Sequence, residues 1–283
     1  MEGFRSLQNL NEAGVLVTGA GRGVGKRLAI GFATAGARVG LLARTKAELD
    51  LAHLEIEHAG GSALRIRADI NDLEQLSTAV DRMRVFCGGV HVLICAAGLQ
   101  GPIGPMLDTP AKAWMEAVET NLFGTMKACR AVLPAMIERR SGKIVVLAGG
   151  GAAHARPNFS SYAASQAALV RFVETLAEEI REHNVQINCL NPGGTYTSMT
   201  DEILKAGERA GWKENEDSQL IRQTGGVPPG KQMQLALFLA SQQSNHISGK
   251  LLHVNDDWKK LKNDNLHPEM FTLRRVQKAE HKL

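Results

Sequence analysis

Residues 15–25 have the sequence Val-Leu-Val-Thr-Gly-Ala-Gly-Arg-Gly-Val-Gly, an apolar segment followed directly by a glycine-rich turn. Glycine leaves the backbone bare, so such a turn can approach a pyrophosphate closely, and the phosphate charge then lies at the N-terminus of the following helix. The apolar segment before the turn and the helical pattern after it agree with this interpretation. The stretch therefore predicts a strand, a turn and a helix that together bind a dinucleotide.

Two other phosphate-binding patterns do not fit this turn. A P-loop would need Gly at position 20 and Ser or Thr at position 27, where the chain has Ala20 and Arg27. The Gly-x-Gly-x-x-Gly dinucleotide pattern fails at Val24. The pattern that remains is Thr-Gly-x-x-x-Gly-x-Gly, beginning at Thr18.

Further short apolar segments follow the first, and segments with helical periodicity separate them. The expected strands are residues 14–18, 38–43, 63–68, 90–96, 143–148, 186–191 and 250–254. Strands that are apolar throughout and alternate with helices indicate a parallel sheet covered on both faces. Because no break in composition interrupts this order, we predict a single α/β domain. Its fold is a Rossmann-type, doubly wound parallel sheet of about seven strands, flanked by helices on both faces.

Two segments lie outside this alternation. Residues 198–230 are long, polar and rich in Gly and charge, and we include them in a domain of residues 1–258. Residues 259–283 form a basic C-terminal extension, whose seven Lys/Arg and three Asp/Glu account for the whole net charge of +4. The neutral remainder is typical of a protein that does not bind nucleic acid. We interpret the extension as a solvated segment or an oligomer arm.

The overall composition, with 44% hydrophobic and 22% charged residues, is that of a soluble globular protein. No run of about 18 apolar residues predicts a membrane span, and residues 1–12 lack the apolar stretch of a signal peptide. The four cysteines are far apart, without a Cys-x-x-Cys pair. This spacing favours reduced thiols in a cytoplasmic protein and disfavours a metal site.

Together with the glycine turn, the later motifs resemble those of the short-chain dehydrogenase/reductase family, in the same order along the chain. They are Asp69-Ile70, Ala97-Gly98, Asn121 in Asn-Leu-Phe-Gly, Tyr162 in Tyr-Ala-Ala-Ser-Gln, and Pro-Gly-Gly-Thr-Tyr-Thr at 192–197. One departure is that the family's usual Asn-Asn before Ala97 is Cys95-Ala96. The resemblance covers roughly residues 10–258 and implies hydride transfer between a nicotinamide and a carbonyl or alcohol carbon.

The resemblance and the turn together give a set of expected cofactor contacts. These residues are Gly19, Arg22, Gly23, Val24, Gly25, Arg44, Asp69, Ile70, Ala97, Gly98, Tyr162, Gln166, Pro192, Gly193, Thr195 and Thr197. An acidic residue at the end of the second strand would bind a ribose 2′-hydroxyl and repel a 2′-phosphate, but that position is Ala43. Arg22 and Arg44, with no carboxylate between them, suit the 2′-phosphate, so we predict NADP(H).

The catalytic residues that the resemblance implies are only partly present. The family uses a Tyr as acid or base, a Lys four residues later, a Ser thirteen residues before it, and an Asn on another helix. Tyr162 and Asn121 match, but the Lys position is Gln166 and the Ser position is Gly149. His154, in the loop before the Tyr helix, is either a surrogate acid or an ordinary exposed histidine.

The missing Lys has a calculable consequence. A unit charge about 4 Å away is worth about 4 kcal/mol at an effective dielectric near 20, or about 3 pKa units on a phenol. Gln166 carries no charge, so Tyr162 should titrate nearer the ordinary tyrosine value. Alcohol oxidation, which needs the phenolate as base, then suffers more than carbonyl reduction, in which the phenol donates its proton.

Two functions therefore remain open. The first is an NADP-dependent carbonyl reductase or alcohol dehydrogenase that acts on a small molecule, with Tyr162 as the proton donor. The second is a catalytically silent nucleotide-binding or regulatory subunit, partnered with an active relative. In either case the resemblance implies a homodimer or homotetramer formed through the helices that hold Asn121 and Tyr162, with residues 198–230 as a lid over the substrate. We expect neither a nucleic-acid nor a membrane partner.

Overall fold

The apolar segment before the glycine turn forms strand β1 (Gly14–Thr18), and all five of its residues are buried. Its neighbours in the sheet are strands on both sides, so every residue of β1 lies in the interior of the protein. Strand β1 lies at the centre of the computed structural model, which describes residues 10–275.

Seven parallel strands form one sheet in the order β3-β2-β1-β4-β5-β6-β7. Besides β1 they are β2 (Arg38–Ala43), β3 (Ser62–Arg67), β4 (Val92–Cys95), β5 (Gly142–Leu147), β6 (Val185–Asn191) and β7 (Leu251–His253). The predicted doubly wound α/β fold is confirmed. The predicted ends of β1 and β2 match, and those of the other five strands differ by at most two residues. The largest difference is at the start of β4, by two residues, and both β4 and β7 are shorter than the apolar segments that predicted them.

The long helices lie between these strands and after β6. They are α1 (Gly23–Thr34), α2 (Lys46–His58), α3 (Leu73–Cys87), α4 (Ala111–Val118), α5 (Gly124–Glu138), α6 (Ser160–Glu179), α7 (Ser198–Ala206), α8 (Trp212–Thr224) and α9 (Pro229–Ala240). Shorter turns of 3₁₀ helix occur at Met106–Asp108, Arg181–His183, Gly207–Ala210, Gln242–Ser244 and Trp258–Lys260. A π-helical segment, Glu119–Phe123, joins α4 to α5.

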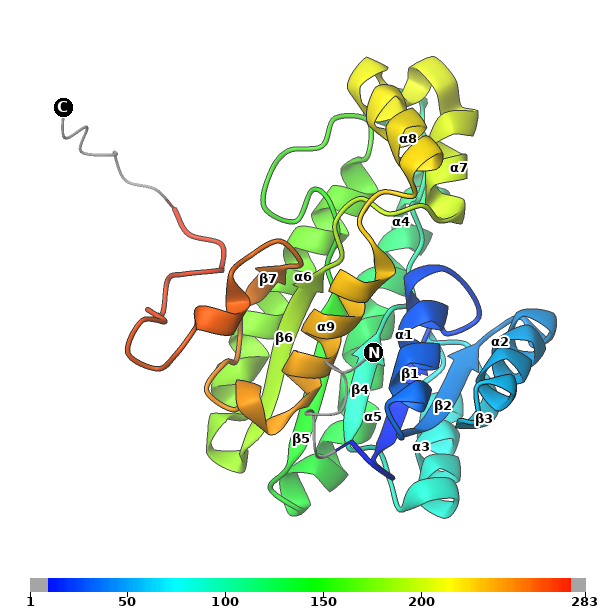
Figure 1. The fold of residues 1–283 in the computed structure, drawn as a ribbon. Coiled ribbons are helices and arrows are strands. Elements are labelled where there is room, and N and C mark those ends of the chain that lie inside the picture. Colours follow the sequence, from blue (N-terminus) through cyan, green and yellow to red (C-terminus); the bar gives the residue numbers. More distant parts are fainter. Residues whose placement is uncertain (1–9, 276–283) are drawn as a thin grey trace.

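The helices cover the sheet in two layers (Figure 1). Apolar residues of α1, α2 and α9 pack with one face of the strands, in a cluster that includes Phe32, Ile56 and Leu237. Residues of α3, α5 and α6 pack with the other face, in a cluster that includes Met83, Val132 and Leu169. Two buried faces explain why the strands are apolar throughout rather than alternating.

The strand order reverses between β1 and β4, because the chain runs outward to β3 and then returns to the other side of β1. At such a reversal the loops after the two strands turn in opposite directions and leave a crevice at their carboxyl ends. The glycine turn follows β1 at this point, and Ala97-Gly98 follows β4. The topology therefore brings two of the sequence motifs together.

The polar segment 198–230 folds into α7, a 3₁₀ turn and α8, at the end of the molecule that carries the carboxyl ends of the strands (Figure 1). An antiparallel bridge between Thr195 and Gly226 closes its base. Arg27 of α1 donates hydrogen bonds to the Thr195 hydroxyl at 2.9 Å and to the Tyr196 carbonyl at 2.6 Å. These bonds fix the base of the segment to the helix that follows the glycine turn.

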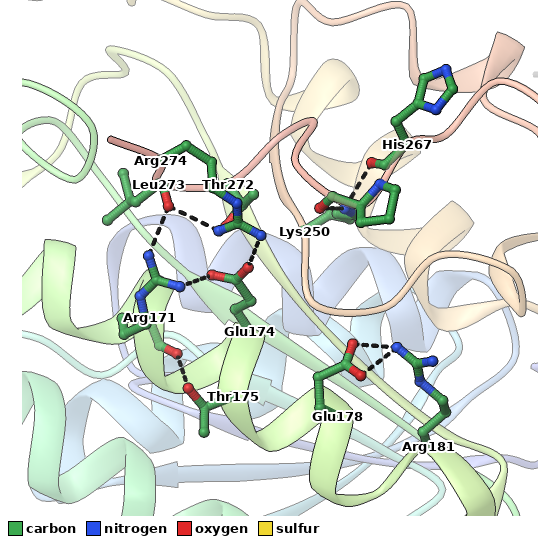
Figure 2. A network of polar contacts seen from close by, with 11 residues as sticks. Arg171, Glu174, Thr175, Glu178, Arg181, Lys250, His267, Thr272, Leu273 and Arg274 are labelled. Carbon is green, nitrogen blue, oxygen red and sulfur yellow. Dashed lines mark hydrogen bonds and ion pairs between the residues drawn. The ribbon is translucent and has the colours of Figure 1, made fainter. Parts of the chain in front are cut away.

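The described part of the C-terminal extension contacts the body of the protein, although most of its residues are exposed. Figure 2 shows that Arg274 pairs with Glu174 of α6, and that Arg171 donates to the Leu273 carbonyl at 2.7 Å. The Leu251 N–H of the edge strand β7 donates to the Phe271 carbonyl at 2.7 Å. Backbone groups of β7 and charges of α6 therefore bind the last described residues of the extension, and its role as a solvated segment or an oligomer arm stays a prediction. The predicted extension beyond residue 275 lies outside the described residues.

Candidate functional site

A cavity of about 680 Å³ lies at the carboxyl ends of the strands and extends beneath α7 and α8. Its volume is within the range of small-molecule and cofactor sites. All five expected catalytic positions line it: Asn121, Gly149, His154, Tyr162 and Gln166. All the expected cofactor residues line it too, except Asp69. The fold thus brings into one cavity motifs that are spread from Gly19 to Thr197.

The glycine turn needs glycine for close packing as well as for its conformation. A Cβ atom at Gly25 would lie 2.3 Å from the Gly19 carbonyl oxygen, and one at Gly19 would lie 2.6 Å from the Ala97 nitrogen. Gly19 and Gly23 also have positive φ angles, 66° and 59°, which favour glycine. The loops after β1 and β4 therefore touch backbone to backbone, at the point where the strand order reverses.

The start of α1 leaves room for an anion. Its N-cap residue is Arg22, and no side chain makes a capping hydrogen bond to the first turn. The first N–H groups of a helix have no partner within the helix and attract negative charge. The bare glycine backbone and these N–H groups fit a pyrophosphate, so the residues present suit a dinucleotide.

The charge around the expected 2′-phosphate site differs from the sequence prediction. The Glu48 carboxylate of α2 lines the cavity and lies 3.7 Å from the Arg22 guanidinium. Arg44 lies 4.0 Å from the Asp69 carboxylate, and Arg22 also opposes the burial that raises the pKa of Glu202 on α7. The prediction that no carboxylate accompanies the two arginines is therefore wrong, because each arginine has a carboxylate within 4.0 Å. Glu48 is one helical turn beyond Arg44, where an acidic residue is favoured by the helix N-terminus.

Several expected cofactor residues use their side chains within the protein. The Thr195 hydroxyl donates to the Val227 carbonyl at 3.3 Å and accepts from Arg27. Thr197 caps α7 in a reciprocal arrangement with Thr200. The Asp69 carboxylate accepts from the Asn71 N–H at 2.9 Å, and Asp69 is not among the residues that line the cavity. These groups shape the walls of the cavity, so a cofactor contact through them would depend on backbone atoms or on exchange of a hydrogen bond.

The Tyr162 hydroxyl fills the space that a side chain at position 149 would occupy. A Cβ atom on Gly149 would lie 2.6 Å from the Tyr162 oxygen. No residue between 10 and 275 forms a hydrogen bond to this hydroxyl, and burial raises the pKa of Tyr162, with the Arg156 charge opposing the rise. Tyr162 is therefore a neutral phenol near neutral pH, packed against the bare backbone where the family has its Ser.

Gln166 is tied to the same place. The Gly149 N–H donates to the Gln166 side-chain oxygen at 2.7 Å. The two positions that depart from the family pattern are thus hydrogen-bonded to each other. Gln166 lies on α6, one turn beyond Tyr162, and Gly149 follows β5. The bond holds the neutral amide of Gln166 against β5 and explains how the buried side chain is satisfied.

Asn121 lies in the π-helical segment between α4 and α5 and is almost fully buried. Its side-chain oxygen accepts from the Leu99 N–H at 2.7 Å, and its amide donates to the Leu99 carbonyl at 3.0 Å and to the Ser165 hydroxyl at 2.9 Å. These bonds join the loop after β4 to α6. The observed role of the Asn121 side chain is therefore to hold together the two elements that carry Gln100 and Tyr162.

Comparison with known proteins identifies the family. A family model described as short chain dehydrogenase matches residues 13–207. This chain belongs to the short-chain dehydrogenase family. Galactitol 2-dehydrogenase (L-tagatose-forming) of Cereibacter sphaeroides is 34% identical over 255 residues, which cover 89% of this chain and 97% of that protein.

Solved structures agree in fold. A crystal structure of NAD⁺-bound xylitol dehydrogenase matches 87% of this chain and 98% of its own with a TM-score of 0.80 at 23% identity. A crystal structure of an actinorhodin polyketide ketoreductase variant with NADPH matches 86% and 95%, with a TM-score of 0.79 at 26% identity. The short-chain dehydrogenase family comprises oxidoreductases that use a nicotinamide cofactor and act on small molecules.

Sequence reasoning missed three residues of this short-chain dehydrogenase site. Arg156 and Glu214 form an ion pair at the end of the cavity beneath α8. Gln100 lines the cavity and is 3% exposed, and its side-chain nitrogen has no hydrogen-bond partner among residues 10–275. None of the three belongs to a family motif. Gln100 and Arg156 lie on the loops after β4 and β5, where functional residues are often found, and Glu214 lies on α8. His154, which was singled out, is exposed at the cavity wall.

Within the described residues, no group of three or more His, Cys, Asp and Glu side chains is arranged to hold a metal ion. Among the same residues, no helix combines the length and the hydropathy needed to cross a membrane. The four cysteines are free thiols, and three of them are buried.

Proposed function

We propose that this protein is an NADP(H)-dependent carbonyl reductase of the short-chain dehydrogenase family, with Tyr162 as the proton donor. The observation that carries the proposal is the Tyr162 hydroxyl, which lies in the same cavity as the glycine turn and has no hydrogen bond to a described residue. Because burial raises the pKa of Tyr162, the phenol keeps its proton at neutral pH and can donate it.

A nicotinamide cofactor held in this cavity would supply the hydride that the carbonyl carbon accepts. The Tyr162 hydroxyl gives its proton to the carbonyl oxygen, and the phenolate that remains takes a proton from solvent. Gly19, Gly23 and Gly25 hold the pyrophosphate against the start of α1. Helices α7 and α8 cover the substrate end of the cavity, where apolar side chains of Ile203 and Ile221 exclude water.

The NADP(H) preference rests on Arg22 and Arg44, which line the cavity beside Ala43 at the end of β2. Glu48 acts against it, because its carboxylate lies beside Arg22 and repels a 2′-phosphate. Structures of similar fold hold NAD⁺ in one case and NADPH in another. We propose that the two arginines outweigh the single carboxylate, giving a preference for NADPH that is smaller than the arginines alone would produce.

A second candidate, a catalytically silent nucleotide-binding subunit, is favoured by the bond between Gly149 and Gln166. This bond uses the Gly149 N–H and the Gln166 side-chain oxygen, so neither group is free to bind a substrate or cofactor while it is formed. Met115 and Phe123, on and just after α4, are exposed apolar side chains that fit the homodimer or homotetramer we expect, or a mixed oligomer with an active relative. Free thiols fit a cytoplasmic location for either candidate.

One experiment separates the two candidates. NADPH and NADH binding is measured by nicotinamide fluorescence, and NADPH oxidation is then followed with a panel of small carbonyl compounds. We expect wild type to reduce at least one compound and Tyr162→Phe to abolish this while NADPH binding is retained. Tyr196→Phe is the matched control, because Tyr196 is the other tyrosine of the chain and its exposed hydroxyl bonds to Asp201 instead. Binding without turnover on any compound would support the silent subunit.

A further inference from the structure

The loop between β5 and α6 places a cation beside Tyr162. The Arg156 guanidinium lies 5.5 Å from the centre of the Tyr162 ring and 4.0 Å from the centre of the Phe159 ring. Its side chain is only 12% exposed. A guanidinium within about 6 Å of an aromatic face is attracted by the ring, and the attraction grows when water is excluded. Arg156 is therefore held against the aromatic side chains at the start of α6.

Arg156 is oriented by a carboxylate from the lid. Its guanidinium donates two hydrogen bonds to Glu214 of α8, at 2.9 and 2.7 Å, and the Glu214 side chain is itself largely buried. Two parallel bonds between a guanidinium and a carboxylate fix both groups in a plane. The pair therefore joins the loop that precedes Tyr162 to the helix that covers the substrate end of the cavity.

We propose that Arg156 is a positioning residue of this reductase, supplying from the β5–α6 loop the positive charge beside Tyr162 that the neutral side chain of Gln166 lacks. The proposal rests on the function proposed above, in which Tyr162 donates the proton. When the proton leaves the hydroxyl for the substrate oxygen, the phenolate carries a full negative charge, and a nearby cation stabilises it. Arg156 thus favours the product side of the proton transfer.

Glu214 sets the strength of this effect. Its carboxylate neutralises much of the Arg156 charge while α8 lies against the loop. Removal of Glu214 alone therefore leaves a stronger cation beside Tyr162, and removal of Arg156 alone leaves an unpaired carboxylate in its place. The two changes break the same contact between lid and loop, but they change the potential at Tyr162 in opposite directions.

Other titratable side chains face the same cavity and bear on Tyr162 from other elements. They are Arg22, Arg44, Glu48, His154, Asp217 and His253. The Arg156 charge is the one that opposes the effect of burial on the pKa of Tyr162. The variants below leave the other six unchanged, so a difference between two variants reports on the Arg156–Glu214 pair.

The chain contains two tyrosines, which makes the proposal directly measurable. In a Tyr196→Phe background, the near-ultraviolet absorbance of the phenolate follows Tyr162 alone as the pH is raised. We expect Arg156→Gln to raise the titration midpoint by about 1 pH unit, and Glu214→Gln to lower it by a smaller amount. Arg156→Lys, which keeps the charge, should bring the midpoint back near that of the background protein.

The opposite signs distinguish an electrostatic role from a purely structural one. Loss of the lid contact alone would move the midpoint in the same direction in both variants, and that result, or an unchanged midpoint, would overturn the proposal. Circular dichroism checks that each variant is folded. If Arg156→Gln does not fold, Glu214→Gln is compared with Arg156→Lys, which breaks the two-bond pair but keeps the charge, and only Glu214→Gln should lower the midpoint. The titration needs no substrate, so it succeeds or fails independently of the turnover assay that tests the proposed function.

Discussion

The cofactor half and the substrate half of the cavity differ in how closely they follow the family pattern. At the glycine turn, Gly19 and Gly25 are required by backbone contacts that a single Cβ atom would disrupt. At the substrate half, Gly149 and Gln166 stand where the family has Ser and Lys, and they bond to each other. The first half is constrained by the packing of β1, β4 and α1, whereas the second depends on side chains at the surface of the cavity.

The difference teaches that a binding site and a catalytic site can diverge separately on one scaffold. The backbone of the glycine turn belongs to the core of the fold, so its loss would cost stability as well as binding. The Gln166 amide accepts a hydrogen bond from the Gly149 N–H, which a lysine ammonium could not do, so the backbone of Gly149 is satisfied after the replacement. Four predictions sharpen the contrast between the two halves.

The largest expected effect is the pH dependence of alcohol oxidation, which depends on Tyr162 in the substrate half. Because burial raises the pKa of Tyr162 above its ordinary value, the phenolate needed for alcohol oxidation increases about tenfold per pH unit through the neutral range. We expect kcat/KM for oxidation to rise about 100-fold from pH 7 to pH 9 and the rate of reduction to stay nearly constant. Rate profiles with one alcohol–carbonyl pair measure both, and a plateau in oxidation below pH 8 would contradict the prediction.

In the cofactor half, Gly25→Ala should weaken NADPH binding by about 10- to 100-fold. The new Cβ would lie 2.3 Å from the Gly19 carbonyl, and relief of such overpacking costs about 1–3 kcal/mol. Fluorescence titration gives the affinity. Gly230→Ala at the start of α9 is the matched control, since a Cβ there meets no atom within 4 Å. Unchanged affinity in Gly25→Ala would show that the turn adapts without strain.

Restoring the family's Ser should destabilise the substrate half. Gly149→Ser places a Cβ 2.6 Å from the Tyr162 hydroxyl, and we expect a loss of about 1–3 kcal/mol in the free energy of unfolding. Gly150→Ser, at a position with nothing within 4 Å, should cost less than about 0.5 kcal/mol.

Denaturant unfolding measures both variants, and a double-mutant cycle with Tyr162→Phe isolates the contact. The Phe variant lacks the hydroxyl, so the loss caused by Gly149→Ser should be smaller in that background. Equal losses in the two backgrounds would show that the hydroxyl is not what opposes a side chain at position 149.

The smallest effect concerns the choice of dinucleotide. Glu48→Gln removes the carboxylate beside Arg22, and we expect NADPH affinity to increase about threefold at low salt with little change for NADH. The gain should fade at high salt, because the groups are partly exposed. Glu57→Gln on the same helix, outside the cavity lining, is the control. A gain of equal size for NADH would place Glu48 outside the 2′-phosphate site.

Most of the fold was predictable from local patterns. The apolar strands and helical segments gave the sheet, because burial on both faces leaves a continuous apolar pattern in each strand. The ends of β4 were less predictable, since Val90 is apolar yet lies before the strand begins. The anchoring of residues 266–274 was not predictable either. It depends on a carbonyl at Phe271 and a charge at Glu174, which no sequence pattern connects.

By itself the sequence determined the succession of strands and helices along the chain, the bare glycine turn, and the absence of Lys at position 166 and of Ser at position 149. These are properties of residue type and local spacing, which fix backbone freedom and the chemistry available at each position. The tertiary structure decided that Glu48 lies beside Arg22, that the Tyr162 hydroxyl fills the space at Gly149, and that Arg156 meets Glu214 across the cavity. Such contacts join elements far apart in the chain, and only packing sets the distances on which their electrostatic effects depend.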